Sequence, residues 1–97
     1  MQVDIVFKGL ASKDETKEFV SHKTEKLKKY FQGKIHARWN LAHEKDNCVA
    51  HLHVTGNHID MFGESEHENL FSAVEQAVDR VESQLKRQKE KVKEHHR

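Results

Sequence analysis

Residues 35–59, IHARWNLAHEKDNCVAHLHVTGNHI, hold two runs in which apolar and polar side chains alternate. The apolar positions are Ile35, Ala37, Trp39 and Leu41 in the first run and Cys48, Ala50, Leu52 and Val54 in the second. A period of two is typical of a strand that is buried on one face. Between the runs, the polar Lys45-Asp46-Asn47 predicts a turn. The segment therefore predicts two neighbouring antiparallel strands, residues 35–44 and 48–55.

A third strand is predicted directly after these two, because Gly56-Asn57 favours a two-residue hairpin loop. With that loop, Thr55 would pair with His58, Val54 with Ile59 and Leu52 with Met61. Inward-facing residues would then oppose inward-facing residues, which supports this register.

The flanking segments predict one more strand and two helices. Residues 2–8 alternate like a strand, and residues 12–31 repeat apolar side chains at three- and four-residue steps. A capping box, Ser12-x-x-Glu15, would open this first helix, and Gly33 would end it. A second capping box, Ser65-x-x-Glu68, would open the last helix, whose apolar stripe continues to residue 85. The order β-α-β-β-β-α predicts an α+β fold, a four-stranded sheet with two helices packed on one face, as in double-stranded-RNA-binding domains.

Size and composition predict a single domain spanning residues 1–97. The chain has 97 residues, 35% hydrophobic and 34% charged, and no proline. Cys48 is the single cysteine, which excludes an internal disulfide and a cysteine-based zinc cluster. The first ten residues do not resemble a secretory signal, and no apolar stretch approaches the ~20 residues that cross a bilayer. We therefore expect a cytoplasmic protein without a membrane partner.

Charge is segregated along the chain although the formal net charge is only +1. Residues 12–34 carry a balance of +3 and residues 80–97 a balance of +4, whereas residues 58–79 hold six acids and no lysine or arginine. Two helices on one face of a sheet would bring the basic regions side by side. A basic face on a nearly neutral protein indicates a nucleic-acid partner. Because Phe62 is the one outward aromatic residue on the predicted sheet, recognition of backbone and shape is favoured over base reading.

The end of the last helix is predicted to extend past the core. A seven-residue strand is ~23 Å long, and a helix covers that length in about 15–16 residues. The helix would therefore cross the sheet by residues 81–85, leaving 86–97 as a basic helical arm. Such an arm is either a solvated terminus or a surface for an anionic partner.

Nine histidines raise the possibility of a metal or pH-sensing site. His51, His53, His58 and Asp60 share the outer face of the predicted hairpin, and a His-x-His pair with a further histidine can hold zinc. Exposed sheet faces also tolerate histidine, and no carboxylate is placed to orient each ring, so solvated histidines are favoured. No catalytic serine, reactive cysteine or phosphate-binding loop is found, so no enzyme activity and no cofactor are expected.

The whole chain resembles the short ribosome hibernation promoting factors, also described as ribosome-associated inhibitor or YfiA-like proteins. The matching stretches are FVSHKTEKLKKYF at residues 19–31, HLHVTGNHI at 51–59 and LFSAVEQAVDRVESQLKRQKEKVK at 70–93. The resemblance implies a β-α-β-β-β-α fold that binds the small ribosomal subunit between head and body, on 16S rRNA, at the mRNA/tRNA channel. It further implies inhibition of translation by occlusion under stress or in stationary phase, by a protein that is monomeric when unbound. The chain ends where long-form members continue into a dimerising domain, so a short form is expected.

Candidate RNA-binding residues follow from the basic regions and from the resemblance. They are Lys23, Lys26 and Lys29 in the first helix and Arg80, Lys86, Arg87, Lys89, Lys91 and Lys93 in the last. Lys23 interrupts an apolar stripe, so its stem would pack and its ammonium emerge. Ser83 stands where the family commonly has a basic residue, and Glu68-Asn69-Leu70-Phe71 replaces its usual Asp-Met-Tyr.

Two other functions remain open from the sequence. The first is a free double-stranded-RNA-binding module, although such modules have the order α-β-β-β-α and a lysine cluster at the second helix, where this chain has Glu66-His67-Glu68. The second is a metal-binding or pH-sensing protein that uses the hairpin histidines.

Overall fold

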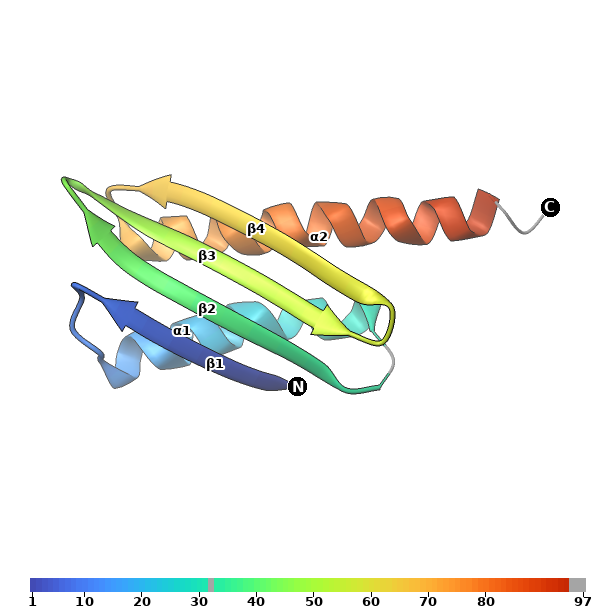
Figure 1. The fold of residues 1–97 in the computed structure, drawn as a ribbon, viewed down its shortest axis with the longest axis horizontal. Coiled ribbons are helices and arrows are strands. Elements are labelled where there is room, and N and C mark those ends of the chain that lie inside the picture. Colours follow the sequence, from blue (N-terminus) through green and yellow to red (C-terminus); the bar gives the residue numbers. More distant parts are fainter. Residues whose placement is uncertain (32, 95–97) are drawn as a thin grey trace.

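The computed structural model describes residues 1–31 and 33–94, with side chains described up to residue 88. The elements are β1 (Gln2–Lys8), α1 (Asp14–Glu25), the 3₁₀ helix η1 (Lys26–Tyr30), β2 (Ile35–Glu44), β3 (Asn47–Gly56), β4 (Ile59–His67) and α2 (Leu70–Glu94). Figure 1 shows the four strands side by side with both helices running along them. The predicted order β-α-β-β-β-α is confirmed.

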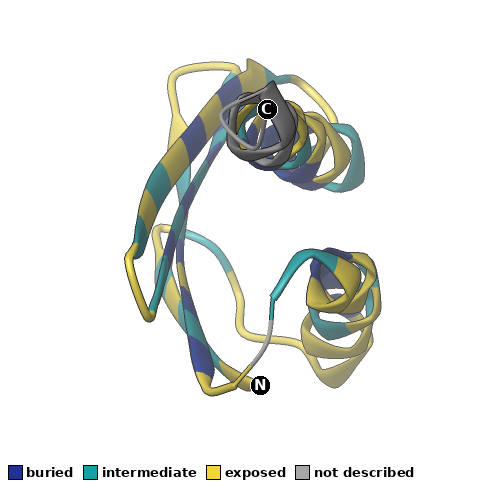
Figure 2. Cartoon of the chain, turned by 90° about the vertical axis from the view of Figure 1, so that its right-hand side faces the viewer, coloured by how far each residue is buried: buried dark blue, intermediate teal, exposed yellow. Residues whose placement is uncertain are grey.

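The sheet has the spatial order β1-β2-β3-β4, with β1 parallel to β2 and the other neighbours antiparallel. A parallel pair needs a long connection, and α1 supplies it between β1 and β2. Seen end-on, α1 and α2 lie on the same side of the sheet (Figure 2). The other face of the sheet carries no helix in the described chain.

The core lies between the sheet and the helices. Its fully buried side chains include Trp39, Leu41, Leu52 and Val54 from the strands and Val74, Val78 and Val81 from α2. The buried indole Nε1–H of Trp39 donates to Thr24 Oγ1 at 3.0 Å, and the Thr24 hydroxyl donates to the Val20 carbonyl at 2.6 Å. Because every polar atom in this chain of contacts has a partner, α1 is joined to β2 without an unsatisfied buried group.

Both predicted capping boxes are wrong. The residue at the N-cap of α1 is Lys13, with no side-chain hydrogen bond, and Ser12 lies before it. Ser65 lies inside β4, opposite Ala50, and its buried hydroxyl donates to Gln76 Oε1 at 2.5 Å. Asn69 caps α2 instead, since its Oδ1 accepts from the Ser72 backbone N–H at 3.1 Å. Pairing with β3 keeps the chain extended through His67, and this outweighs the local capping pattern.

The first helix is also shorter than predicted. The single helix expected over residues 12–31 is an α-helix to Glu25 followed by the tighter turns of η1. The chain then reaches Gly33, whose φ of 96° is the left-handed conformation that favours glycine. The predicted stop at Gly33 therefore agrees with the backbone.

The hairpin between β3 and β4 differs from the predicted register by two residues. Gly56 pairs with Ile59, so the loop is Asn57-His58, with His58 at a φ of 65°. The other turn is Lys45-Asp46, because Asn47 already pairs with Glu44. A shift of two keeps every side chain on its predicted face.

The shifted register sets Leu52 opposite Gly63 rather than Met61. A Cβ atom at Gly63 would collide with the Ala77 carbonyl oxygen and lie 2.8 Å from Val81 Cγ2. Only glycine therefore lets α2 approach β4 so closely, which gives a packing reason for this register.

Candidate nucleic-acid interface

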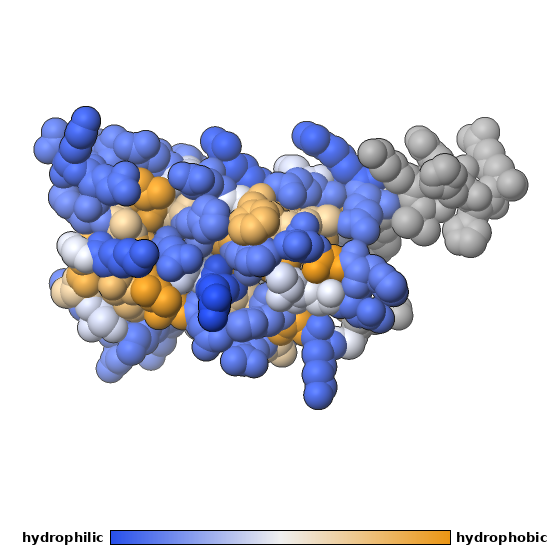
Figure 3. Space-filling model, in the orientation of Figure 1, coloured by the Kyte–Doolittle hydropathy of each residue, from blue (hydrophilic) through white to orange (hydrophobic). Residues whose placement is uncertain are grey.

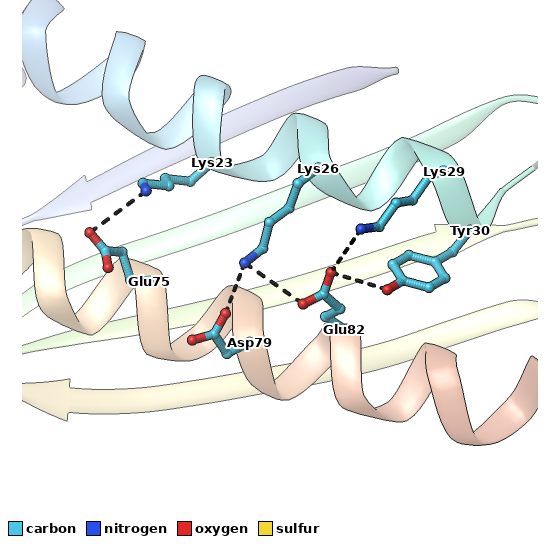
Figure 4. A network of polar contacts seen from close by, with 7 residues as sticks. All are labelled: Lys23, Lys26, Lys29, Tyr30, Glu75, Asp79 and Glu82. Atoms are coloured by element: carbon cyan, nitrogen blue, oxygen red, sulfur yellow. Dashed lines mark hydrogen bonds and ion pairs between the residues drawn. The ribbon is translucent and has the colours of Figure 1, made fainter.

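Helix α2 presents three sides: one is apolar, one carries acids and one carries arginines. The core side holds the buried valines and Leu85. A second side faces α1 and η1; we call this contact the seam, formed by Lys23, Lys26, Lys29, Tyr30, Glu75, Asp79 and Glu82 (Figure 4). The third side borders β4; we call it the flank, formed by Phe62, Gly63, Glu64, Arg80, Ser83, Gln84 and Arg87.

The seam pairs each predicted RNA-binding lysine of the first helix with an acid of α2. Lys26 Nζ lies 2.9 Å from Asp79 Oδ1 and 3.7 Å from Glu82 Oε1. Lys29 Nζ lies 3.7 Å from Glu82 Oε2, which also accepts from the Tyr30 hydroxyl at 3.1 Å. The two helices therefore lie side by side as expected, but the lysines of the first basic region face carboxylates of α2 across the seam.

Lys23 occupies the other end of the seam. Its Nζ lies 3.8 Å from Glu75 Oε1 and 5.6 Å from the centre of the Phe19 ring, which itself packs on Phe71 at 4.4 Å. The Lys23 side chain is 35% exposed. The expectation of a packed stem and an emerging ammonium agrees with this arrangement.

The seam also changes two acid–base equilibria. The hydrogen bond to Asp79, helped by the charges of Asp79, Glu82 and Glu75, raises the pKa of Lys26 against the opposing effect of desolvation. Desolvation, followed by the hydrogen bond to Glu82, raises the pKa of Tyr30. Both groups therefore keep their protons over the physiological range, and the seam stays a lysine–carboxylate network.

The flank holds Arg80 and Arg87 on the β4 side of α2. They border an open groove of about 380 Å³ together with Phe62, Glu64, Ser83 and Gln84. Within the part of the chain whose side chains are described, no carboxylate oxygen lies within 4.0 Å of either guanidinium. Two exposed arginines on one helix side can each offer a bidentate fork to phosphate.

Histidines on the uncovered face of the sheet form pairs rather than a metal site. His53 Nε2 lies 2.5 Å from Asp60 Oδ1, and His36 Nε2 lies 2.5 Å from Asp4 Oδ2. His58 lies in the β3–β4 turn. Among residues 1–31 and 33–88, no group of three or more His, Cys, Asp or Glu side chains is placed to hold a metal ion. Cys48 is buried on the inner face of β3, as predicted.

Comparison with known proteins connects this architecture to a family. The family model described as "Sigma 54 modulation protein / S30EA ribosomal protein" matches residues 3–93. The chain belongs to this family. The resemblance identified from the sequence is confirmed.

Several relatives match the S30EA family chain along its length. It is 31% identical to the ribosome hibernation promoting factor of Salmonella typhimurium and 27% identical to that of Escherichia coli K12, each over 97 residues that cover 98% of this chain and 100% of the relative. The N-terminal domain of Thermus thermophilus Protein Y superposes with a TM-score of 0.85 at 27% identity, covering 90% of this chain and 98% of that domain. A ribosomal subunit interface protein from Coxiella burnetii shares the fold, with a TM-score of 0.79 at 15% identity over 92% and 98% of the two chains.

The end of α2 extends the basic surface of this family member. Leu85 is the last buried residue, and Lys86, Arg87 and Gln88 are exposed. The helix backbone continues to Glu94, so the predicted arm is helical to that point. The side chains of Lys89, Lys91 and Lys93 and all of residues 95–97 lie outside the described residues. No helix of the described chain is long and apolar enough to span a membrane.

Sequence reasoning missed two features of the interface. It counted the lysines of the first helix without their partners, although acids at positions 75, 79 and 82 repeat at helical spacing and could have signalled a matching acidic stripe. It also placed Glu66-His67-Glu68 at the start of the last helix, whereas Glu66 and His67 lie in β4. The first turn of α2 holds no acid, so the predicted acidic helix start is wrong.

Proposed function

We propose that this S30EA family protein is a ribosome hibernation factor. It binds the 16S rRNA of the small ribosomal subunit at the mRNA/tRNA channel and inhibits translation by occlusion, without catalysis. The observation that carries the proposal is the match along the whole length to proteins named ribosome hibernation promoting factor. The protein would act in the cytoplasm as a single ribosome-binding domain, monomeric when unbound.

The charge arrangement supports RNA as the partner. Lys86, Arg87 and Arg80 are exposed on α2, and the helix carries three further basic residues, at 89, 91 and 93, beyond its last buried side chain. Cations of this kind bind phosphates and release counterions. We assign the main RNA contacts to α2 and its arm.

The lysines of the first helix take a secondary role in this proposal. Lys23, Lys26 and Lys29 remain candidate RNA contacts, but each must share its ammonium between phosphate and the seam acids. Their charge is already compensated locally, so their net attraction for RNA is reduced. The occlusion would therefore depend more on α2 than on α1.

Co-sedimentation with isolated small subunits tests the proposal. The protein should pellet with the subunit at low salt and dissociate as salt rises, by several log units in affinity per decade of salt when several phosphates are contacted. The purified protein should also inhibit a cell-free translation extract in proportion to subunit occupancy. Full translation at large molar excess, or pelleting that is independent of salt, would contradict the proposal.

A further inference from the structure

Phe62 is a large aromatic side chain displayed on the uncovered face of the sheet. It lies on β4, an edge strand, and is 50% exposed. Figure 3 shows this face from the sheet side, where hydrophilic side chains predominate and apolar ones stand in separate spots.

Two histidine rings from β3 surround Phe62. The ring of His53, its direct partner in the ladder, is stacked 4.0 Å away at an interplanar angle of 9°. The ring of His51 lies 5.4 Å away at 37°. The contact with Asp60 also fixes the His53 ring, so the stacked His53–Phe62 pair is preorganised before any ligand binds. The sequence indicated an isolated aromatic residue, whereas the fold builds three adjacent rings.

Phe62 also borders the flank groove, where Arg80 and Arg87 lie. Gln84 Nε2 donates to the Phe62 carbonyl at 2.6 Å, and the close approach of α2 at Gly63 fixes the helix against β4. The arginines are seven residues apart, or roughly 10 Å along the helix axis, with Ser83 between them. Phe62 and the two arginines therefore line one groove on a rigid support.

We propose that the flank binds an unpaired RNA nucleotide, with the base stacked on Phe62 and the backbone phosphate held between Arg80 and Arg87. The inference rests on the proposed function, since it names the kind of RNA that this side of the protein contacts. Aromatic platforms beside basic grooves bind single strands because every base offers a π-face and every nucleotide a phosphate. In a duplex the bases stack on each other and offer only their edges.

Glu64 sets the direction of the strand in this groove. Glu64 lines the groove from β4, whereas the arginines line it from α2. It repels phosphate and accepts hydrogen bonds from base amino groups or a ribose 2′-hydroxyl. The backbone therefore lies toward α2 and the base toward the sheet.

The test measures binding of a short unstructured oligoribonucleotide that carries one 2-aminopurine. Stacking on Phe62 should quench the 2-aminopurine fluorescence, and a matched RNA duplex should bind more weakly than the single strand at equal salt. Phe62→Leu keeps an apolar side chain without a ring and should reduce affinity about ten-fold and remove the quenching. Val6→Leu, on the same face at the opposite edge strand and 43% exposed, is the matched control and should change neither.

The phosphate part of the site has its own variants. Arg80→Gln and Arg87→Gln should each lower the affinity for the oligonucleotide. Each should also reduce the salt dependence of binding by about one counterion. Lys17→Gln, on the exposed side of α1, removes the same charge and should have a smaller effect. Circular dichroism of each variant should match the parent protein.

The outcomes separate this inference from the proposed function. Unchanged affinity and quenching in Phe62→Leu would overturn the inference, as would equal binding of duplex and single strand, or binding of an acidic peptide in preference to the oligoribonucleotide. If small-subunit binding persists in those cases, the proposed function stands. If the parent protein quenches the oligonucleotide through Phe62 but does not bind small subunits, the inference holds and the proposed function fails.

Discussion

The seam and the flank lie on two sides of helix α2, and they differ in whether acidic side chains face their positive charges. In the seam, Lys23, Lys26 and Lys29 from the first helix meet Glu75, Asp79 and Glu82 of α2. On the flank, Arg80 and Arg87 lie beside a groove with an aromatic ring. The two sets of basic residues looked equivalent in the sequence. A basic residue therefore attracts RNA strongly only where the fold does not already place an acidic side chain beside it.

Helix geometry creates this difference. The acids at 75, 79 and 82 recur at steps of four and three and so share one side of α2. Arg80, Ser83 and Arg87 recur at steps of three and four on a different side. Packing of the core valines orients the helix, and the acids then point to α1 while the arginines point to the edge of the sheet.

The largest expected effect comes from neutralising the basic residues of the arm and of the end of the flank together. The combined variant Lys86→Gln, Arg87→Gln, Lys89→Gln, Lys91→Gln should lose at least 100-fold in small-subunit affinity, because four phosphate contacts are removed. Sedimentation at fixed salt measures this, and the helical circular dichroism signal should be retained.

The matched control for that variant changes the same number of basic residues away from α2. This control variant lowers the net charge equally at four exposed positions. It combines Lys8→Gln, Lys13→Gln, Lys17→Gln and Lys34→Gln. It should retain most of the affinity. Equal loss of affinity in both variants would show that net charge alone sets the affinity. The proposed difference between the seam and the flank would then be wrong.

The next effect tests the support of the flank. Gly63→Ala should lower the free energy of unfolding by about 1–3 kcal/mol, because its Cβ collides with the backbone of α2 at Ala77. Denaturant unfolding measures it. Gly56→Ala is the control in the neighbouring strand. Its Cβ would lie 3.4 Å from the Lys34 carbonyl oxygen, so its cost should be smaller.

A smaller effect is expected from releasing the seam. Glu82→Gln removes the carboxylate that faces Lys26 and Lys29, so small-subunit affinity should rise two- to three-fold. The side chains of Lys26 and Lys29 are 41% and 64% exposed and that of Glu82 is 15% exposed, so loss of these ion pairs should lower the free energy of unfolding by about 1 kcal/mol. Glu18→Gln changes the net charge equally on the exposed side of α1 and should raise affinity less. An equal rise in affinity in both variants would show that the seam acids do not reduce the attraction of the seam lysines for RNA.

The smallest effect is a pH dependence at alkaline pH. Lys26 and Tyr30 have pKa values raised above 10.5 and 10.0, so the folded state holds their protons more tightly than the unfolded state. Their contribution to stability is complete below those ordinary values and is lost as pH rises through the folded pKa values. Thermal unfolding between pH 9 and 12 should show a steeper decline for the parent protein than for Glu82→Gln. Parallel curves would contradict the seam's role.

Element types and faces could be predicted because they depend on local periodicity. Alternation in residues 35–44 placed Trp39 and Leu41 inward, and both are fully buried. The helix starts could not be predicted, because Ser65 fits a capping box equally well until β3 pairs with it. The hairpin register failed for a similar reason, since Gly63 is needed opposite Leu52 only once α2 lies across β4.

The amino-acid sequence alone determined the order of strands and helices, the apolar face of each and the family resemblance, because these are written in spacings of two to four residues. Tertiary structure alone decided which charges compensate each other and which rings stack. Lys26 and Asp79 are 53 positions apart, and Tyr30 and Glu82 are 52 apart. Contacts over such separations follow from how the helices pack on the sheet, and no local pattern encodes them.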